Sequence, residues 1–76
     1  RQDEKFDIIF MDPPYYRGMA KKCLINIDSC DIVSPVGLVL VEHFKKDALG
    51  AELERLIFAD ERRYGDTVIT ILGRAL

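Results

Sequence analysis

The residues best suited to chemistry lie together in the stretch FDIIFMDPPYYRG, Phe6–Gly18. A run of apolar residues ends there in a carboxylate (Asp12), two prolines (Pro13 and Pro14) and an aromatic ring (Tyr15). Because proline fixes its own φ angle and restricts the residue before it, we expect Asp12 and Pro13 to be extended. The Asp12 carboxylate and the Pro13 carbonyl can then aim at one point as two hydrogen-bond acceptors, with Tyr15 beside them.

Two rigid acceptors and a ring suit a planar base that carries an exocyclic NH2 group. The lone pair of such an amine is delocalised into the base, and two acceptors on its N–H bonds localise it and orient the nitrogen toward an electrophile. Stacking on Tyr15 can hold an extruded base, which is worth about 1–3 kcal/mol per base. No strong base is required, since the nitrogen can lose its proton after the transfer. These residues therefore predict group transfer to a nucleobase amine.

The first half of the chain predicts a strand, a helix and a second strand. Phe6–Met11 is almost continuously hydrophobic, which is typical of a strand buried on both faces of a parallel sheet. A helix is predicted from about Arg17 to Asp31. The apolar side chains expected on one face of this helix are Met19, Cys23, Leu24, Ile27 and Cys30. The proline and glycine of Ser34–Gly37 predict a turn, and Leu38–Glu42 predicts a second buried strand.

The second half predicts a helix and a hairpin. After a loop at HFKK, Asp47 is positioned to cap a helix that reaches about Leu56. Leu56–Tyr64 and Thr67–Gly73, joined at Gly65–Asp66, then predict an antiparallel pair of strands. The predicted order is β-α-β-α-β-β, an α/β fold with a right-handed crossover at its start. Ligands of open α/β sheets bind beyond the carboxyl ends of the strands, where Asp12 is expected.

Each candidate residue also has a purely structural interpretation. The Asp12 motif could simply end a strand and cap the next element, and Tyr16 is expected to pack rather than to contact a substrate. Glu42 and His43 close the second strand at the same edge of the sheet. His43 is the only histidine and could act as a general base, but an exposed loop histidine is the default expectation. Tyr64–Asp66 is expected to serve the turn.

At this point the sequence resembles a known family. DPPY after a hydrophobic strand resembles the catalytic motif of S-adenosylmethionine-dependent methyltransferases that modify exocyclic amines of adenine or guanine. FDIIFMDPPY, GLVLVEH and RRYGDTVITIL together resemble the carboxy-terminal half of the bacterial small-subunit ribosomal RNA guanine-N2 methyltransferases. The resemblance implies that Asp12 and the Pro13 backbone hold the guanine amine, that Pro14 fixes the turn and that Tyr15 stacks on the base.

The same resemblance implies a Rossmann-like class I sheet of seven strands, the last of them antiparallel. Residues 1–76 would form the C-terminal catalytic half and supply strands four to seven. The first strand, the glycine-rich cofactor loop and the acid that binds the ribose would lie in the other half, so this half alone is expected to be inactive. Of the residues in this chain, only Asp12 is a candidate cofactor contact.

The five glycines are too scattered to form a glycine-rich cofactor loop of the GxGxxG kind. They are Gly18, Gly37, Gly50, Gly65 and Gly73. Ribosomal RNA and the small ribosomal subunit are the partners that the resemblance implies. Two alternatives stay open: N6-adenine methylation of DNA or RNA, and a non-catalytic interaction module that retained the fold.

Amino-acid composition bears on nucleic-acid binding, metal binding and the cellular compartment. Eleven basic and 13 acidic residues give a net charge of −2, whereas a self-sufficient nucleic-acid binder usually has a basic excess. Lys21-Lys22, Lys45-Lys46 and Arg62-Arg63 are therefore expected to be solvated surface. Two cysteines without a metal or disulfide pattern fit a reducing, cytoplasmic protein, and no metal site is predicted. The apolar runs are far shorter than the roughly 18 residues of a membrane-spanning helix.

The start of the chain predicts that one strand has an unpaired edge. Arg1 is followed almost at once by the strand Phe6–Met11, which suggests a piece of a longer protein. One flank of that strand would lack its neighbour in the sheet. Because unpaired hydrophobic edges recruit other chains, self-association through Phe6–Met11 is expected.

Overall fold

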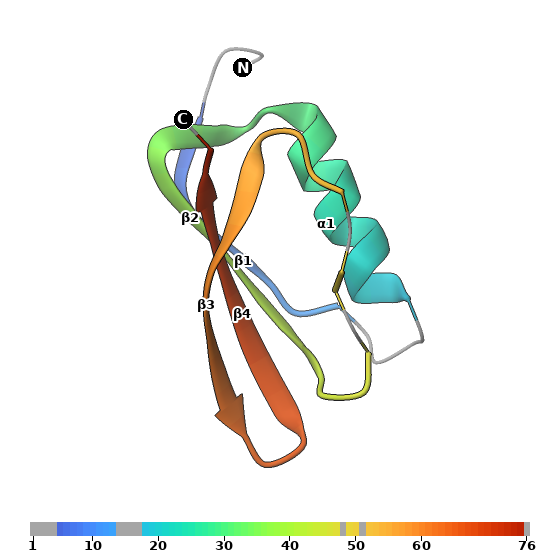
Figure 1. The fold of residues 1–76 in the computed structure, drawn as a ribbon. Helices are drawn as coiled ribbons and strands as arrows, with labels where there is room; N and C mark the ends of the chain where they lie inside the picture. The colour runs from blue at the N-terminus through green and yellow to red at the C-terminus, as the bar shows by residue number, and fades with distance from the viewer. Residues whose placement is uncertain (1–4, 14–17, 48, 51, 76) are drawn as a thin grey trace.

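The computed structural model describes residues 5–13, 18–47, 49–50 and 52–75, which form one helix and one four-stranded sheet. The strand order is β1-β2-β4-β3, and the helix lies across one face of the sheet (Figure 1). The elements are β1 (Phe6–Met11), α1 (Met19–Cys30), β2 (Val33–Phe44), β3 (Leu56–Tyr64) and β4 (Thr67–Arg74).

The predicted α/β class is confirmed. Strand β1 pairs in parallel with β2, and α1 connects them, as the first half of the sequence predicts. The last strand, β4, runs antiparallel to both β2 and β3. The hairpin is found with its predicted boundaries almost unchanged: Tyr64 pairs with Thr67, and Gly65 takes a positive φ of 61° in the turn. Glycine adopts that conformation without steric cost.

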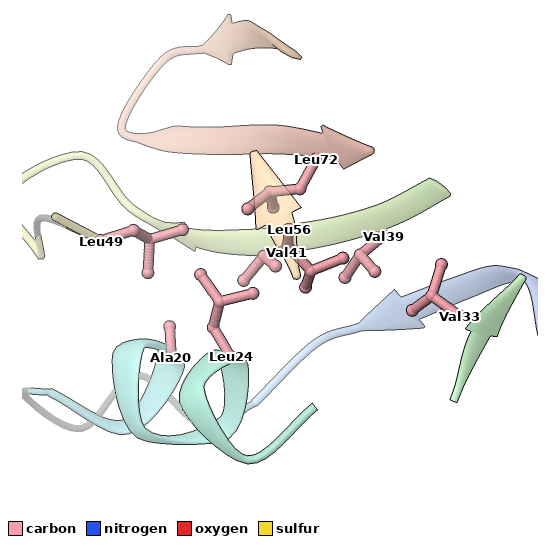
Figure 2. Packing of buried hydrophobic residues seen from close by; sticks show 8 residues of the cluster. All are labelled: Ala20, Leu24, Val33, Val39, Val41, Leu49, Leu56 and Leu72. Atoms are coloured by element: carbon pink, nitrogen blue, oxygen red, sulfur yellow. The ribbon is translucent and has the colours of Figure 1, made fainter. Parts of the chain in front are cut away.

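The core lies between α1 and the sheet. Leu24 is fully buried on the helix, and the side chains of Val39, Val41 and Leu72 meet it from the sheet (Figure 2). The predicted helix boundaries are close to those observed, but the predicted buried face is partly wrong. The residues of α1 that are buried are Ala20, Leu24 and Asp28. Cys30 is exposed and Cys23 is half-buried, so the contact face is rotated relative to the predicted one.

The predicted second helix is not present in the described part of the segment between β2 and β3. Residues 45–47, 49–50 and 52–55 form turns, a bend and irregular backbone. The backbone N–H groups of Glu54, Arg55 and Leu56 donate to the carboxylate of Asp28, at 2.8, 2.8 and 2.9 Å. These donors are thus used by a tertiary contact. The leucine spacing correctly indicated burial, since Leu49 and Leu56 belong to the core, but not a helix.

Two predicted loops are parts of β2. Ser34–Gly37 lies within the strand, opposite a register shift: Phe6 pairs with Val33, and Ile8 pairs with Leu38. Proline and glycine therefore mark an irregularity in pairing, not a turn between elements. His43 and Phe44 also belong to the strand and pair with β4.

Strand β1 is not buried on both faces, contrary to the prediction. Ile9 and Met11 pack against the core, whereas the side chains of Ile8 and Phe10 are 67% and 54% exposed. The reason is that α1 covers only one face of the sheet (Figure 1). Within the described residues, β1 pairs only with β2 and therefore forms an edge of the sheet.

Candidate active site

Asp12 and Pro13 lie at the carboxyl end of β1, as predicted. Strand β1 ends at Met11, which is in register with Val41 of the parallel strand β2, so Asp12 follows beside Glu42. Asp12 is exposed and Pro13 is half-buried. The carboxylate is therefore at the edge where ligands of open α/β sheets bind, and it is open to solvent.

The rest of the predicted acceptor-and-ring site lies outside the described residues. Pro14, Tyr15, Tyr16 and Arg17 belong to this undescribed stretch. The roles of Pro14 in fixing the turn and of Tyr15 in stacking on a base therefore stay predictions.

A hydrogen bond joins the residue just before α1 to the segment that follows β2. The backbone N–H of Gly18 donates to Oδ1 of Asp47, at 3.1 Å. Gly18 has a positive φ of 78°, and its carbonyl accepts the first helical bond from the N–H of Lys22, at 3.0 Å. Asp47 therefore does not cap a second helix. It joins the segment after β2 to the residue just before α1, a contact that sequence reasoning missed.

His43 is a buried residue of β2 and not the exposed loop histidine that we expected. Its side chain lies on the same face as Val41, and the residue is 6% exposed. Nδ1 lies 3.0 Å from the carbonyl oxygen of Phe44, and Nε2 lies 2.8 Å from Oγ1 of Thr70. A carbonyl oxygen only accepts, so Nδ1 carries the proton and Nε2 accepts from the Thr70 hydroxyl in the neutral ring.

This arrangement argues against His43 as a general base. Both ring nitrogens already have partners within the protein. Glu42 precedes His43 in the strand and therefore points to the opposite face of the sheet, the face on which Ile8 and Phe10 are exposed. Of Glu42 and His43, Glu42 is therefore the one that shares a face of the sheet with Phe10 of β1.

A second carboxylate, Asp28, is more strongly engaged than any of the predicted site residues. It is 5% exposed. Burial raises its pKa, but the three backbone N–H groups of Glu54, Arg55 and Leu56 outweigh burial, so the pKa lies below its usual value. A low pKa and backbone bonds to both oxygens indicate a structural carboxylate that anchors β3 to α1, not an acid or base in catalysis.

Two further features, a metal site and a membrane-spanning helix, were sought in the part of the chain that the structure describes. No three histidine, cysteine, aspartate or glutamate side chains gather there in a way that could hold a metal ion. Across these same residues, no helix has the length and apolar character needed to span a membrane.

Three solved structures have a similar fold. A conserved hypothetical protein from Streptococcus pyogenes is 26% identical, with a TM-score of 0.76, over 91% of this chain and 43% of its own. HI0767 from Haemophilus influenzae, which bears the name of a candidate methylase, is 22% identical, with a TM-score of 0.75, over 92% and 44%.

The third structure is yhhF from Escherichia coli, named as a candidate methyltransferase. It is 19% identical, with a TM-score of 0.76, over 97% of this chain and 41% of its own. The chain thus spans about two fifths of the length of these structures, and its sheet and helix have the fold of part of a methyltransferase-like domain. No curated protein matches the chain.

The sequence itself matches a protein family over residues 1–73, from the segment before β1 to the next-to-last residue of β4. This match includes Asp12, the strand β2 and the β3–β4 hairpin except for Arg74. The chain belongs to the family described as Conserved hypothetical protein 95.

Proposed function

We propose that residues 1–76 are the C-terminal catalytic half of an S-adenosylmethionine-dependent methyltransferase. The proposed substrate is the exocyclic N2 amine of a guanine in small-subunit ribosomal RNA. The position of Asp12 carries this proposal: an exposed carboxylate directly after β1, followed by Pro13, at the carboxyl edge of a parallel strand pair. The fold shared with HI0767 and yhhF, whose names describe methyl transfer, supports it.

The chain's own residues would bind and orient the amine. The Asp12 carboxylate accepts one N–H of the guanine NH2 group, and the Pro13 carbonyl accepts the other. Two fixed acceptors hold the nitrogen lone pair toward the incoming methyl group, and such positioning can supply several kcal/mol of the barrier reduction. Tyr15 would stack on the extruded base and hold it in the plane that these bonds require. The proton leaves the nitrogen only after the methyl group has been transferred.

The methyl group would come from S-adenosylmethionine, which supplies an electrophilic sulfonium methyl when bound. The described residues fit a limited contact with it: Asp12 is exposed at the right edge of the sheet, while no glycine-rich loop is present in the sequence. Most of the cofactor contacts would thus come from the other half of the parent protein.

A second proposal concerns the partner of β1, which we propose to be a second copy of this chain in the isolated half. The two edges of the sheet differ in charge. Strand β3 carries Asp60, Glu61, Arg62 and Arg63 in succession, whereas β1 contains one charged residue, Asp7. Charged side chains protect an edge strand from pairing with another chain, so β1 is the edge open to association.

Replacement of Asp12 tests the proposed function. Asp12→Ala in the parent enzyme should lower kcat for methylation of a small-subunit RNA fragment by at least 100-fold, because one acceptor and the carboxylate charge are lost. Cofactor affinity, measured by calorimetry, should change much less than kcat. Asp7→Asn is the matched control, since it removes a carboxylate charge near the other end of the strand that Asp12 follows, while its amide oxygen can still accept from Ser34.

Full activity of Asp12→Ala would overturn the proposal. The methylated product also decides the substrate: mass spectrometry of nucleosides should give N2-methylguanosine. N6-methyladenosine would instead favour the adenine alternative. Absence of any methylation by the parent enzyme, together with absence of cofactor binding, would favour a non-catalytic interaction module.

A further inference from the structure

A hollow of about 370 Å³ lies on the face of the sheet that carries His43. Strands β2, β3 and β4 and the loop at residues 49–50 contribute to it. It is large enough for a small ligand, since such pockets usually measure about 300–1,000 Å³. Neither the Asp12 corner nor the core described above uses this space.

The floor of the hollow presents a hydrogen-bond acceptor. Thr70 is buried there, and its hydroxyl gives its proton to Nε2 of His43, because Nδ1 of the ring is committed as a donor to Phe44. The remaining lone pairs of Oγ1 are then available to a ligand N–H group. The rest of the floor is apolar and consists of buried Val68 and Leu49.

The wall and rim add an aromatic ring and charges of both signs. Phe58 lines the hollow and is 48% exposed, so part of the ring can receive a stacked base. Arg63 and Lys45 stand at the rim with Glu61. Arg63 lies 3.9 Å from Glu61 and Lys45 lies 3.0 Å from Asp66, which leaves Arg63 in the looser pair. A guanidinium group suits bidentate binding of a phosphate.

The acceptor of Thr70 and the ring of Phe58 suit the base of a nucleotide, and the cation of Arg63 suits its phosphate. The hollow also opens at the same end of the sheet as Asp12, because β2 ends there and β3 and β4 turn there. The bond from Gly18 to Asp47 ties the segment beside the hollow to the residue just before α1.

We propose that this hollow binds a nucleotide of the RNA strand next to the one that is methylated. The base would stack on Phe58 and donate to Thr70 or Glu61, and its phosphate would pair with Arg63. This inference rests on the proposed function for the identity of the strand, but binding in the hollow requires neither cofactor nor methyl transfer.

The test uses the 76-residue chain and two matched variants. Guanosine 5′-monophosphate is titrated while backbone amide resonances are recorded by NMR, with inorganic phosphate as the comparison probe. The amides of Phe58, Arg63 and Thr70 should shift, and the nucleotide should bind at least tenfold more tightly than phosphate. Arg63→Ala should weaken binding about tenfold. Arg62→Ala should change it less than twofold, since both side chains are 63% exposed but Arg62 points to the other face.

A third variant tests the role of the ring. Phe58→Leu retains an apolar side chain but removes stacking, and it should weaken the nucleotide about fivefold and leave phosphate binding unchanged. Equal effects of Arg62→Ala and Arg63→Ala, or equal affinity for phosphate and nucleotide, would overturn the proposal in favour of simple charge attraction. Tighter binding of an acidic peptide than of the nucleotide would also overturn it.

The outcome is independent of the Asp12 experiment. Loss of methylation in Asp12→Ala with no nucleotide binding in the hollow would leave the proposed function standing and sink this inference. Nucleotide binding at the hollow in a parent whose Asp12→Ala variant stays fully active would sink the proposed function and leave the hollow as a nucleotide site without an assigned strand.

Discussion

The carboxylate of Asp47 holds the backbone N–H of Gly18, at 3.1 Å, across 29 positions of sequence. Gly18 directly precedes α1, and Asp47 lies in the segment that follows β2. The start of the helix and the segment after β2 are therefore linked by one charge-assisted bond. Such a bond is expected to restrict the ensemble of conformations open to both.

Asp47→Ala should increase the rate of amide hydrogen exchange at Gly18 about tenfold. That factor corresponds to roughly 1.4 kcal/mol, close to the net contribution of one hydrogen bond to a charged group. Asp47→Asn is the matched control, because its amide oxygen can still accept the bond. Equal exchange rates in wild type and Asp47→Ala would show that the bond does not order the start of the helix in solution.

Replacement of Asp28 should destabilise the fold. In Asp28→Asn an NH2 group takes the place of one of two oxygens that together accept three backbone N–H bonds, so a donor faces a donor in a buried place. We expect a loss of about 2–3 kcal/mol in the free energy of unfolding at pH 7. Urea denaturation followed by circular dichroism measures it. Glu52→Gln, an exposed acid of the same segment, should change it by less than about 0.5 kcal/mol.

The lowered pKa of Asp28 predicts how the free energy of unfolding depends on pH. The folded pKa of Asp28 lies below its ordinary value of 3.8, so its contribution is fully present above that value and is lost as the pH falls through the folded pKa. The stability difference between wild type and Asp28→Asn should therefore be constant from pH 7 to about 5 and shrink below about pH 4. A difference that grows toward low pH would contradict the assigned direction.

Gly37→Ala should be costly because the added methyl group has no room. A Cβ atom at this position would lie 2.9 Å from the carbonyl oxygen of Phe6, 2.9 Å from Cγ1 of Val33 and 3.0 Å from the carbonyl oxygen of Asp7. Two of these atoms are backbone, so β1 must shift away from β2, and we expect a loss of about 1–3 kcal/mol. Gly50→Ala is the control, since a Cβ atom there meets nothing within 4 Å. Similar unfolding midpoints for the two variants would refute the argument.

Self-association should depend on β1 and not on β3. Phe10→Lys adds a charge to an exposed position of the apolar edge, and it should shift sedimentation equilibrium toward the monomer by at least fivefold in the dissociation constant. Ile57→Lys adds the same charge to an equally exposed position, 52% against 54%, on the opposite edge strand. A wild-type chain that stays monomeric at high concentration would sink the proposal.

Much of the fold follows from local pattern. The β-branched run at Thr67–Ile71 and the glycine at position 65 define the hairpin, because strand preference and a positive φ coincide there. The apolar run of β1 and the helix boundaries of α1 were predicted for similar reasons. The position of Asp12 after β1 followed as well, since a carboxylate and a proline end the strand in the sequence itself.

The errors have a common physical cause, which is contact between residues far apart in the sequence. The segment before β3 has helical leucine spacing, but Asp28 takes its backbone donors. Ser34–Gly37 has turn residues, but Ser34 donates to Asp7 at 2.8 Å and the segment stays in the strand. His43 was expected in a loop, but pairing with β4 extends β2 past it. Local sequence carries no signal for these partners.

The three bonds at Asp28 also bear on how the chain reaches its native state. They join the last turn of α1 to residues 26 to 28 positions later, so helix docking and hairpin closure are not separable events. If the hairpin detached while α1 stayed packed, a desolvated negative charge would be left without donors. Partly folded forms are therefore destabilised, and the helix and the hairpin should unfold in a single cooperative transition. The folding rate should depend on contact between segments that are far apart in the sequence.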